Sequence, residues 1–490
     1  MFKWFFILFA ITSSKYIRIS LTGNITTLKY ASSLALPGDI IEFESGNYPP
    51  QHVAKRTYGA FDNPIKIRPA LNAKVVFETA TSQTYAFNIP DSSNIDVEGP
   101  FIARSATQQT VAAVNCTNIT MSGFSIYNST RWAMFASGTN ITIRNNYADG
   151  CVLENEHCKS EKFVQCFGTG VVTYDGPILS KLITFENNEI THAWGEGIDF
   201  IFCTECVARN NYIHDVFPSM ITVDNAKNLL IENNILRFSN GPLCPEQNQY
   251  HAIAIGDEDW PPVYVSTTNI TVRNNFIWGA RFGVSYWGWS PVAYYSEITV
   301  AQNTFFNISG LALAFQAKCV VEGAAKNNQF KNNFIYSNYN LYAALVHQNE
   351  LNSWNISDNV YYEGCKNFLK DSWNGTDGNA HSIHLTQNET SVLKLWNGGK
   401  YGNCTNESYF KWDVPTYCFV PHNKSLLYHS GVYVTYYDLD AKMNKDFYGC
   451  VRSNIKPSIG VAEGQFDCVL VEGSYTCYVY VLLSAIFLII

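Results

Sequence analysis

The chain has 490 residues, of which 47% are hydrophobic and only 15% are charged, so it can bury a large core and is not a disordered polyelectrolyte. Its 41 acidic and 33 basic residues give a net charge of −8, which argues against nucleic acid as a partner because phosphate backbones attract basic proteins. The length allows several ordinary domains or one long repetitive domain.

Both ends of the chain carry apolar segments that are typical of a secreted, membrane-anchored protein. Residues Met1–Ser14 combine an early Lys3 with the short apolar run Trp4–Ile11, which predicts a secretory signal peptide. Residues 473–490 are largely apolar and predict a GPI-attachment signal, with a short membrane anchor as the alternative. We therefore expect a membrane partner through the C-terminus and a position on the extracellular face of the plasma membrane, or else secretion.

Sequons and cysteines indicate the same secretory route. The fourteen cysteines suit an oxidising compartment and predict disulfides for most of them, and a bridge from Cys203 or Cys206 to a neighbouring segment is favoured over zinc binding. No sequon lies between Asn140 and Asn269, so the predicted glycans spare the middle of the chain. The thirteen predicted glycosylation sites are Asn24, Asn115, Asn118, Asn128, Asn140, Asn269, Asn307, Asn355, Asn374, Asn388, Asn403, Asn406 and Asn423.

One phrase recurs through the middle of the chain: apolar–Thr–apolar–charged–Asn–Asn–x–apolar, with a tightest spacing of 23 residues. Each copy alternates apolar and polar residues, which indicates a short strand that must stack on its neighbours to bury one face. The paired Asn predicts a tight bend, since Asn tolerates the left-handed region and its amide can bond to the next coil. The copies are Ile141–Ala148, Ile183–Ile190, Cys206–Ile213, Leu229–Leu236 and Ile270–Ile277, with weaker ones at Ile298–Phe305, Asn332–Asn333 and Asp358–Asn359.

A second strand follows each bend, at Gly197–Ile201, Met220–Asp224, Ala252–Ile255 and Phe282–Tyr286. If the copies stack as coils, Asn187, Asn210 and Asn233 should lie in one line, each about 4.8 Å from the next.

This pattern resembles the right-handed parallel β-helix proteins of the pectate-lyase-like superfamily, over roughly residues 24–370. The segment Ser33–Tyr48 resembles their short capping helix and first strand, and Pro457–Gly464 resembles their closing phrase. The resemblance implies an all-β chain with a single-stranded right-handed parallel β-helix (24–370), a short N-terminal capping helix, and an irregular Cys-rich segment with a closing strand (371–464). Such proteins include lyases, hydrolases, epimerases and adhesins, so the fold does not decide the function.

The motifs of three enzyme groups in that superfamily are absent from the sequence. These are the paired Arg around a Pro of pectate lyases, the Gly-His-Gly and paired-Asp signatures of polygalacturonases, and the Asp-Pro-His-Glu of alginate epimerases. Candidate residues must therefore be found from their positions on the coils.

The charged residues that precede Asn–Asn alternate in sign through successive copies. They read Arg144, Glu186, Arg209, Glu232 and Arg273. Stacked directly, they would form a ladder of opposite charges worth about 0.2–1 kcal/mol per pair, so we assign them a structural role.

The second strands carry the candidate catalytic acids. Asp199 and Thr222 share a column because each lies eleven residues after the second Asn of its copy, and Asp224 lies one coil on and two residues along. With Ile198 and Ile221 facing inward, all three should face outward on one exposed face. Their geometry puts the Cα atoms of the two aspartates about 8 Å apart, within the roughly 6.5–9.5 Å carboxyl separation of inverting glycosidases.

Aromatic, acidic and imidazole side chains surround this face in the sequence, and such groups stack on sugar rings, bind hydroxyls and move protons. We take His214 and His251 as further catalytic candidates. The proposed substrate-binding residues are Trp194, Glu196, Thr222, Trp260, Trp287 and Trp289.

A lyase would need a base and a positive group to neutralise a uronate, for which Lys181, Arg237 and Arg281 are the candidates. Asp215, Asp257 and Asp259 could supply hard oxygen ligands for Ca²⁺, the one cofactor that we consider. We leave two functions open: a monomeric secreted or cell-surface glycoprotein that binds and cleaves or modifies a polysaccharide, and a non-catalytic surface adhesin or coat protein that binds glycans.

Overall fold

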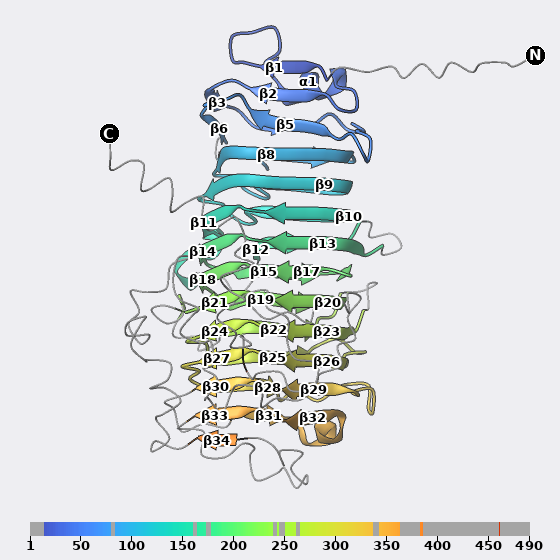
Figure 1. Cartoon of the computed structure of the whole chain (residues 1–490), viewed down its shortest axis with the longest axis vertical. Helices are drawn as coiled ribbons and strands as arrows, with labels where there is room; N and C mark the ends of the chain where they lie inside the picture. Colours follow the sequence, from blue (N-terminus) through green and yellow to red (C-terminus); the bar gives the residue numbers. More distant parts are fainter. Residues whose placement is uncertain are drawn as a thin grey trace, which may run out of the picture.

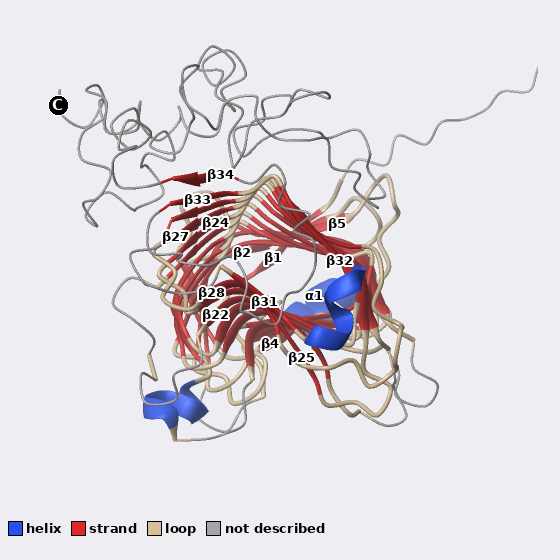
Figure 2. Cartoon of the chain, turned by 90° about the horizontal axis from the view of Figure 1, so that it is seen from below, coloured by secondary structure: helices blue, strands red, loops and turns tan. Residues whose placement is uncertain are grey.

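The computed structural model describes residues 14–362 apart from 80–83, 160–163, 173–177, 239–242, 245–249, 261–264 and 337–342, together with residues 383–385 and 460. Almost every element is a short strand that pairs in parallel with the strand one coil away, and the coils stack along one long axis (Figure 1). Three stacks of strands, here called sheets A, B and C, surround the axis (Figure 2). The predicted solenoid of stacked parallel strands is confirmed.

Three long strands bend across the corners of the early coils and therefore belong to more than one sheet. They are β8 (Ser93–Arg104), β9 (Val111–Tyr127) and β10 (Met134–Arg144).

Sheet A holds the second strands of the repeat. Its members besides the long strands are β4 (Gln51–His52), β7 (Phe87–Pro90), β12 (Gln165–Thr169), β15 (Glu196–Ile201), β19 (Ser219–Asp224), β22 (His251–Asp257), β25 (Phe282–Gly288), β28 (Leu311–Phe315) and β31 (Ala344–Val346).

Sheet B holds the strands that precede the paired Asn. Its members are β1 (Tyr16–Ile19), β2 (Ile40–Phe43), β5 (Ile65–Pro69), β13 (Ser180–Glu186), β16 (Cys203–Thr204), β17 (Val207–Arg209), β20 (Lys227–Glu232), β23 (Thr267–Arg273), β26 (Tyr295–Ala301), β29 (Asn328–Lys331) and β32 (Trp354–Ser357).

Sheet C holds the strands that follow the paired Asn. Its members are β3 (Gly46–Tyr48), β6 (Val75–Glu78), β11 (Tyr147–Cys151), β14 (Glu189–Ala193), β18 (Tyr212–Val216), β21 (Ile235–Arg237), β24 (Phe276–Trp278), β27 (Thr304–Phe306), β30 (Phe334–Tyr336), β33 (Val360–Tyr362) and β34 (Ile383–Leu385).

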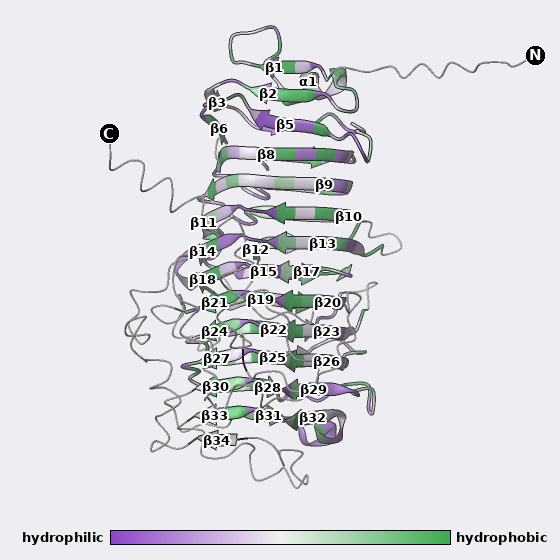
Figure 3. Ribbon diagram, viewed as in Figure 1, coloured by the Kyte–Doolittle hydropathy of each residue, from purple (hydrophilic) through white to green (hydrophobic). Residues whose placement is uncertain are grey.

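The core runs the length of the stack because inward residues recur in the same column of each coil. In sheet A the column Ile198, Ile221, Ile253, Val284 and Leu313 is fully buried. Along each strand, outward polar residues alternate with inward apolar ones, as the alternating colours along β8 illustrate (Figure 3). The period of two read from the sequence therefore sets which side chains face inward.

The two Asn residues of each copy have different tasks at the corner between sheets B and C. The first, represented by Asn187, Asn210 and Asn233, has a φ of 54–57°, in the left-handed region that Asn tolerates. The second forms a buried ladder in which each side-chain amide donates to the side-chain oxygen one coil on, at 3.0–3.1 Å. This ladder comprises Asn146, Asn188, Asn211, Asn234, Asn275, Asn303, Asn333 and Asn359. The bend predicted for the paired Asn is therefore present at the first Asn. The side-chain hydrogen bonds between coils are formed by the second Asn of each pair.

The predicted charge ladder is present in sheet B. Its members pair in register, and Arg209 bonds Glu186 at 2.7 Å while Arg273 bonds Glu232 at 2.9 Å. The second pair is buried on both sides, whereas Arg209 is 40% exposed. These two ion pairs therefore fasten successive coils to each other, which agrees with a structural role.

A short helix, α1 (Leu28–Leu34), supplies the predicted N-terminal cap. Thr27 begins it by accepting a hydrogen bond from the backbone N–H of Tyr30, and Leu28 and Ala31 bury against the first coils. Short 3₁₀ helices also form at Leu153–Cys158 and Gln348–Ser353. Within the described residues, no helix is long and apolar enough to cross a membrane.

Disulfides form only in part as predicted. Cys151 bonds Cys166 and Cys158 bonds Cys244. The predicted bridge from Cys203 or Cys206 to a neighbouring segment is wrong, because both are buried free thiols that face the core. Two further buried free thiols in the described part of the chain are Cys116 and Cys319.

Some predictions concern regions that are wholly or largely outside the described residues. These are the signal peptide, the GPI signal, the sequons from Asn374 onward and most of the segment 371–464. Within that last segment, β34 pairs with β33, and the Gly460 N–H donates to the Asn332 carbonyl at 2.9 Å. The eight described sequons include six whose Asn has positive φ, namely Asn115, Asn118, Asn128, Asn140, Asn269 and Asn307.

Candidate active site

Four carboxyl groups converge on the outer side of sheet A. Asp199 lies on β15 opposite Thr222 of β19, and Asp224 lies two residues further along β19, as the column argument predicts. Glu196 begins β15, and Glu258 follows β22. We call Glu196, Asp199, Asp224 and Glu258 the carboxyl cluster.

The prediction that Asp199 and Asp224 are exposed is wrong. Their exposed fractions are 1% and 4%, although both occupy outward positions on the strand. The chain after β22 folds back over them: the Glu258 N–H donates to Asp224 Oδ1 at 3.3 Å, and the Trp260 indole packs edge-on against Phe202 at 6.2 Å. Glu196 and Glu258 remain half-buried and mark the accessible side of the cluster.

Burial and mutual repulsion keep protons on the cluster. Burial raises the pKa of Asp199 well above its usual range, and the charges of Glu196 and Asp224 add to this. Burial also raises the pKa of Asp224 well above its usual range, followed by the effect of Glu258 and Glu196. Burial, with a smaller contribution from the charge of Glu258, raises the pKa of Glu196 to about 7. Burial thus favours the protonated form of these carboxyls, and the pKa of Glu196, about 7, lies near neutral pH.

Neutral hydrogen-bonding groups hold the carboxyls in place. The Gln165 side chain lowers the pKa values of Glu196 and Asp199, against the larger effect of burial, and its Oε1 accepts from the Trp132 indole N–H at 2.7 Å. The Thr222 hydroxyl lowers the pKa of Glu196 and is hydrogen-bonded to the Ser219 hydroxyl. Asp199 Oδ1 is buried and has no hydrogen-bond partner among the described residues, so the cluster offers one unsatisfied acceptor.

Aromatic side chains lie on the C-terminal side of the cluster. The Trp260 indole N–H donates to Glu258 Oε2 at 3.0 Å, and Trp260 is 46% exposed. Trp287 lies two coils beyond Asp224. Its ring centroid is 6.3 Å from that of Trp289, and the Trp289 side chain is 73% exposed. Trp194, by contrast, packs on the core and on His157, at 5.3 Å between ring centroids.

The two candidate histidines do not lie in the cluster. His214 is on sheet C, where its Nδ1 is 2.9 Å from Asp215 Oδ2 and its ring stacks on Tyr212 at 4.4 Å. His251 is on sheet A, one coil beyond Ser219, and its Nδ1 bonds the Ser285 hydroxyl at 2.7 Å. Burial, and then the charge of Arg281, lower the pKa of His251 to about 4, so it is a neutral imidazole beside the cluster.

The basic residues proposed for a lyase are engaged elsewhere. Lys181 pairs with Glu205 at 2.9 Å on sheet B. The Arg237 guanidinium lies 5.7 Å from the Trp278 ring on sheet C, and that of Arg281 lies 5.0 Å from the Phe282 ring. In the described part of the chain, none of the three forms an ion pair with the carboxyl cluster.

The three aspartates proposed for Ca²⁺ do not form one site. Asp215 pairs with His214 on sheet C, and Asp259 is an exposed side chain after β22. Asp257 is buried, and its Oδ1 accepts from the backbone and hydroxyl of Thr267 while Oδ2 accepts from the Tyr294 N–H. Across the described residues no group of three His, Cys, Asp or Glu side chains could hold a metal ion. Asp257 instead fastens the segment that follows β25.

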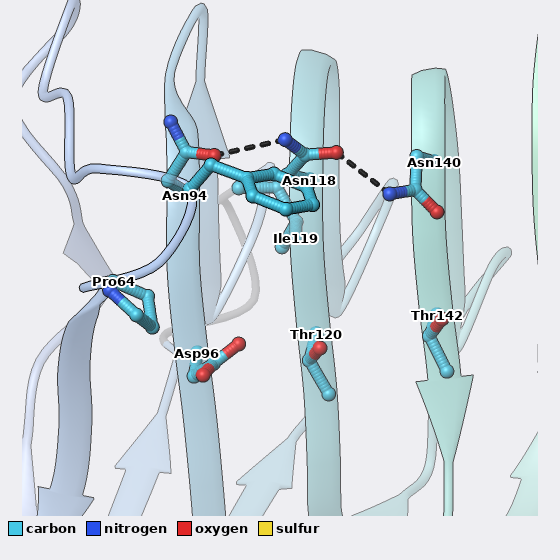
Figure 4. Close-up of a pocket in the computed structure, with 9 residues that line it drawn as sticks. Pro64, Asn94, Asp96, Asn118, Ile119, Thr120, Asn140 and Thr142 are labelled. Carbon is cyan, nitrogen blue, oxygen red and sulfur yellow. Dashed lines mark hydrogen bonds between the residues drawn. The ribbon is translucent and has the colours of Figure 1, made fainter.

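A recess of about 150 Å³ lies on sheet B of the N-terminal coils (Figure 4). Asn118 bonds Asn94 at 2.9 Å and Asn140 bonds Asn118 at 2.6 Å along one wall. Its lining contains a single ionisable side chain, so it cannot combine an acid with a base. The lining residues are Phe61, Pro64, Asn94, Asp96, Asn118, Ile119, Thr120, Asn140 and Thr142.

Sequence reasoning missed two residues of the site, Gln165 and Trp132. Gln165 occupies the same column as Glu196, but its strand β12 is separated from the next Asn–Asn phrase by a long insertion, so the repeat did not reveal it. Glu258 lies after β22, where no column of the repeat constrains it, so the repeat does not place it either.

As the pH rises from about 4.5 to about 7, the wild type should lose stability, and Glu196→Gln should lose less of it. A carboxyl whose folded pKa is raised binds its proton more tightly in the native state, so its contribution to stability is full below the unfolded pKa and is lost as the pH rises through the folded pKa. The depressed pKa of His251 has the opposite slope in both proteins, so the difference between them isolates Glu196. Thermal unfolding across this pH range measures it.

The exposed Asp259 provides the control for that experiment. Asp259→Asn should leave the pH profile of the wild type unchanged, whereas an unchanged profile in Glu196→Gln would contradict the assigned pKa.

Comparison with known proteins agrees with the architecture. The family described as the right handed beta helix region matches residues 159–324, and no curated protein matches the chain. Pectate lyase Pel9A aligns over 93% of this chain and 98% of its own at 14% identity, with a TM-score of 0.50.

Two other solved structures align with lower scores. A mannuronic acid specific polysaccharide family 6 lyase from human gut microbiota covers 77% of this chain and 93% of its own, at 14% identity and a TM-score of 0.49. An alginate lyase from Paenibacillus sp. str. FPU-7 covers 59% and 94%, at 18% identity and a TM-score of 0.44. From the stacked coils and the match to Pel9A, the chain is a right-handed parallel β-helix protein with the pectate-lyase-like fold.

Proposed function

We propose that this protein is a glycoside hydrolase that cleaves a polysaccharide bound along the outer side of sheet A. The observation that carries the proposal is the carboxyl cluster, in which Asp199 and Asp224 lie one coil apart on sheet A and burial raises the pKa values of both. The fold is shared with a pectate lyase, a protein named for a polysaccharide substrate.

Asp199 is suited to the general acid and Asp224 to the general base. Asp199 is the more deeply buried of the two, and its Oδ1 has no described partner, which favours the protonated form. Burial raises the pKa of Asp224 as well, so Asp224 acts as the base only when it is ionised, and the Glu258 backbone N–H that it accepts favours that form. The column offset puts their Cα atoms about 8 Å apart, a value within the roughly 6.5–9.5 Å that separates the carboxyls of inverting glycosidases.

The proposed reaction is a single displacement. The Asp199 carboxyl gives its proton to the glycosidic oxygen as the bond from that oxygen to the anomeric carbon breaks. A water oxygen bonds to the anomeric carbon from the opposite face, and Asp224 takes the proton that the water releases. One proton thus moves from Asp199 to Asp224 per bond cleaved, and exchange with solvent restores the starting state.

The positions of the basic residues favour hydrolysis over elimination. A lyase abstracts a carbon-bound proton beside a carboxylate that a positive charge must neutralise, and Lys181, Arg237 and Arg281 are all engaged away from the cluster. Incubation of the purified protein with neutral and uronate polysaccharides, followed by measurement of new reducing ends and of unsaturated sugars, tests the proposal. New reducing ends without unsaturated products support it, and unsaturated products contradict it.

We also propose that the protein is a glycoprotein of the cell surface, held by a GPI anchor at its C-terminus. The support is the apolar segment 473–490, the signal-like start of the chain and the sequons, which avoid the coils that carry the cluster. Phosphoinositide-specific phospholipase C should release the protein from intact cells. Release by detergent alone, with the C-terminal peptide still present by mass spectrometry, would show a membrane anchor or no GPI processing.

A further inference from the structure

We infer that the site takes a polysaccharide without anionic groups, laid along the helix axis so that one sugar ring stacks on the Trp287–Trp289 pair. The inference rests on the proposed hydrolase and adds to it the class of substrate and the direction of the bound chain. Two observations carry it: an aromatic platform in line with Asp224, and a cluster of acidic side chains with which no basic side chain of the described residues forms an ion pair.

Register places the platform in line with the cluster. Asp224, Gly256 and Trp287 are paired successively across β19, β22 and β25, so they form one column along the axis. A Cβ atom at Gly256 would lie 2.3 Å from the Trp287 ring, which means that the indole covers Gly256 and leans toward Asp224. The glycine therefore makes room for an aromatic surface directly beside the proposed base.

The platform is open to a ligand. Trp289 is 73% exposed, an unusual state for the largest apolar side chain, and it lies against Trp287. Sugar rings present apolar C–H faces that stack on indoles, so a pair of adjacent indoles fits a saccharide. Two coils, about 10 Å, separate Trp287 from Asp224, which is about the length of a disaccharide and places the stacked sugar next to the cleavage point.

Charge sets the class of sugar. The cluster and Asp259 make this part of sheet A acidic, and no basic side chain of the described residues pairs with the cluster. A uronate or sulfated chain would bring further negative charge to carboxyls that already repel each other. The accessible Glu196 and Glu258 carboxyls can accept a hydrogen bond from a sugar hydroxyl or ammonium group, whereas a sugar carboxylate offers no donor.

Binding measured by titration calorimetry tests the inference. The polymers are a soluble neutral β-glucan, xylan, chitosan, polygalacturonate and alginate, and the protein is the full chain. We expect binding to at least one of the first three polymers and none to the two polyuronates. The chitosan arm tells an ammonium group from a neutral hydroxyl as the donor to the cluster.

Three variants probe the platform. Trp289→Ala should weaken binding about tenfold, and Trp289→Phe should restore most of it. Gly256→Ala should also weaken binding, because its new methyl displaces the Trp287 indole without removing it. The control is Phe61→Ala, which removes an 80% exposed ring from the distant recess and should bind like the wild type. Circular dichroism and thermal unfolding confirm that each variant is folded.

Each outcome separates the inference from the hydrolase proposal. Tight binding of a polyuronate, binding of no polymer, or wild-type binding by the folded Trp289→Ala protein would overturn the inference. Trp289-dependent binding of a non-anionic chain with no turnover would support the binding mode and contradict the hydrolase.

Discussion

Replacing Asp199 or Asp224 by Asn is expected to lower turnover about a thousandfold while the protein stays folded. Asn keeps the size and most hydrogen bonds of Asp but can neither give nor take the proton. The double variant should be no slower than the slower single variant by more than a small factor, since acid and base act in one step. Rates of reducing-end release from the polymer that the wild type cleaves measure the effect.

Stability separates this result from simple misfolding. Both aspartates are buried and their pKa values are raised, so a neutral amide should be tolerated at least as well as the carboxyl at neutral pH. Asp257→Asn is the contrasting variant, because that carboxyl accepts bonds from Thr267 and Tyr294 and holds a loop in place. It should lower the melting temperature more than Asp199→Asn does. Full activity in both single variants would show that Asp199 and Asp224 take no part in catalysis.

Replacing Asn234 by Ala is expected to destabilise the fold by about 4 kcal/mol. The Asn234 oxygen accepts from the backbone and side-chain N–H groups of Asn211, at 2.9 and 3.0 Å, and its amide donates to the Ala208 carbonyl and to Asn275. Removing the side chain leaves several buried groups with fewer partners, each at a penalty of about 1–3 kcal/mol. The midpoint of urea unfolding measures the change.

The neighbouring Asn233 supplies a matched control within the same corner. Its φ of 57° requires only a residue that tolerates the left-handed region, and its Oδ1 makes no hydrogen bond with the described residues. Asn233→Ala should therefore cost only about 1–2 kcal/mol. Equal losses at the two positions would show that the ladder contributes no more than the bend does.

The repeat made the fold predictable because each coil obeys the same local rules. Alternation fixed the inward residues, and the paired Asn fixed the corner between sheets B and C. Register in stacked coils follows from the number of residues after the Asn. This count therefore predicted that Asp199 and Asp224 lie together on sheet A.

The environment of the site could not be read in the same way. Strand parity tells which side of the sheet a residue faces but not what lies over it, and Glu258 and Trp260 reach the cluster from a segment outside the repeat. Gln165 lies on β12, and an insertion lengthens the chain between the paired Asn of its coil and this strand. Counting residues from the Asn therefore did not place Gln165 in the column of Glu196. His214 lies near Asp199 in sequence but on another sheet, because the bend at Phe217–Pro218 separates β18 from β19.

The most direct measurement is the fate of solvent oxygen during cleavage. Wild-type protein is incubated with the polysaccharide that it cleaves in water enriched in heavy oxygen, and the new ends are analysed by mass spectrometry, with Asp199→Asn as the background control. Hydrolysis by the carboxyl cluster predicts one heavy oxygen at each new reducing end. Products that carry no heavy oxygen and gain a carbon–carbon double bond would contradict the account.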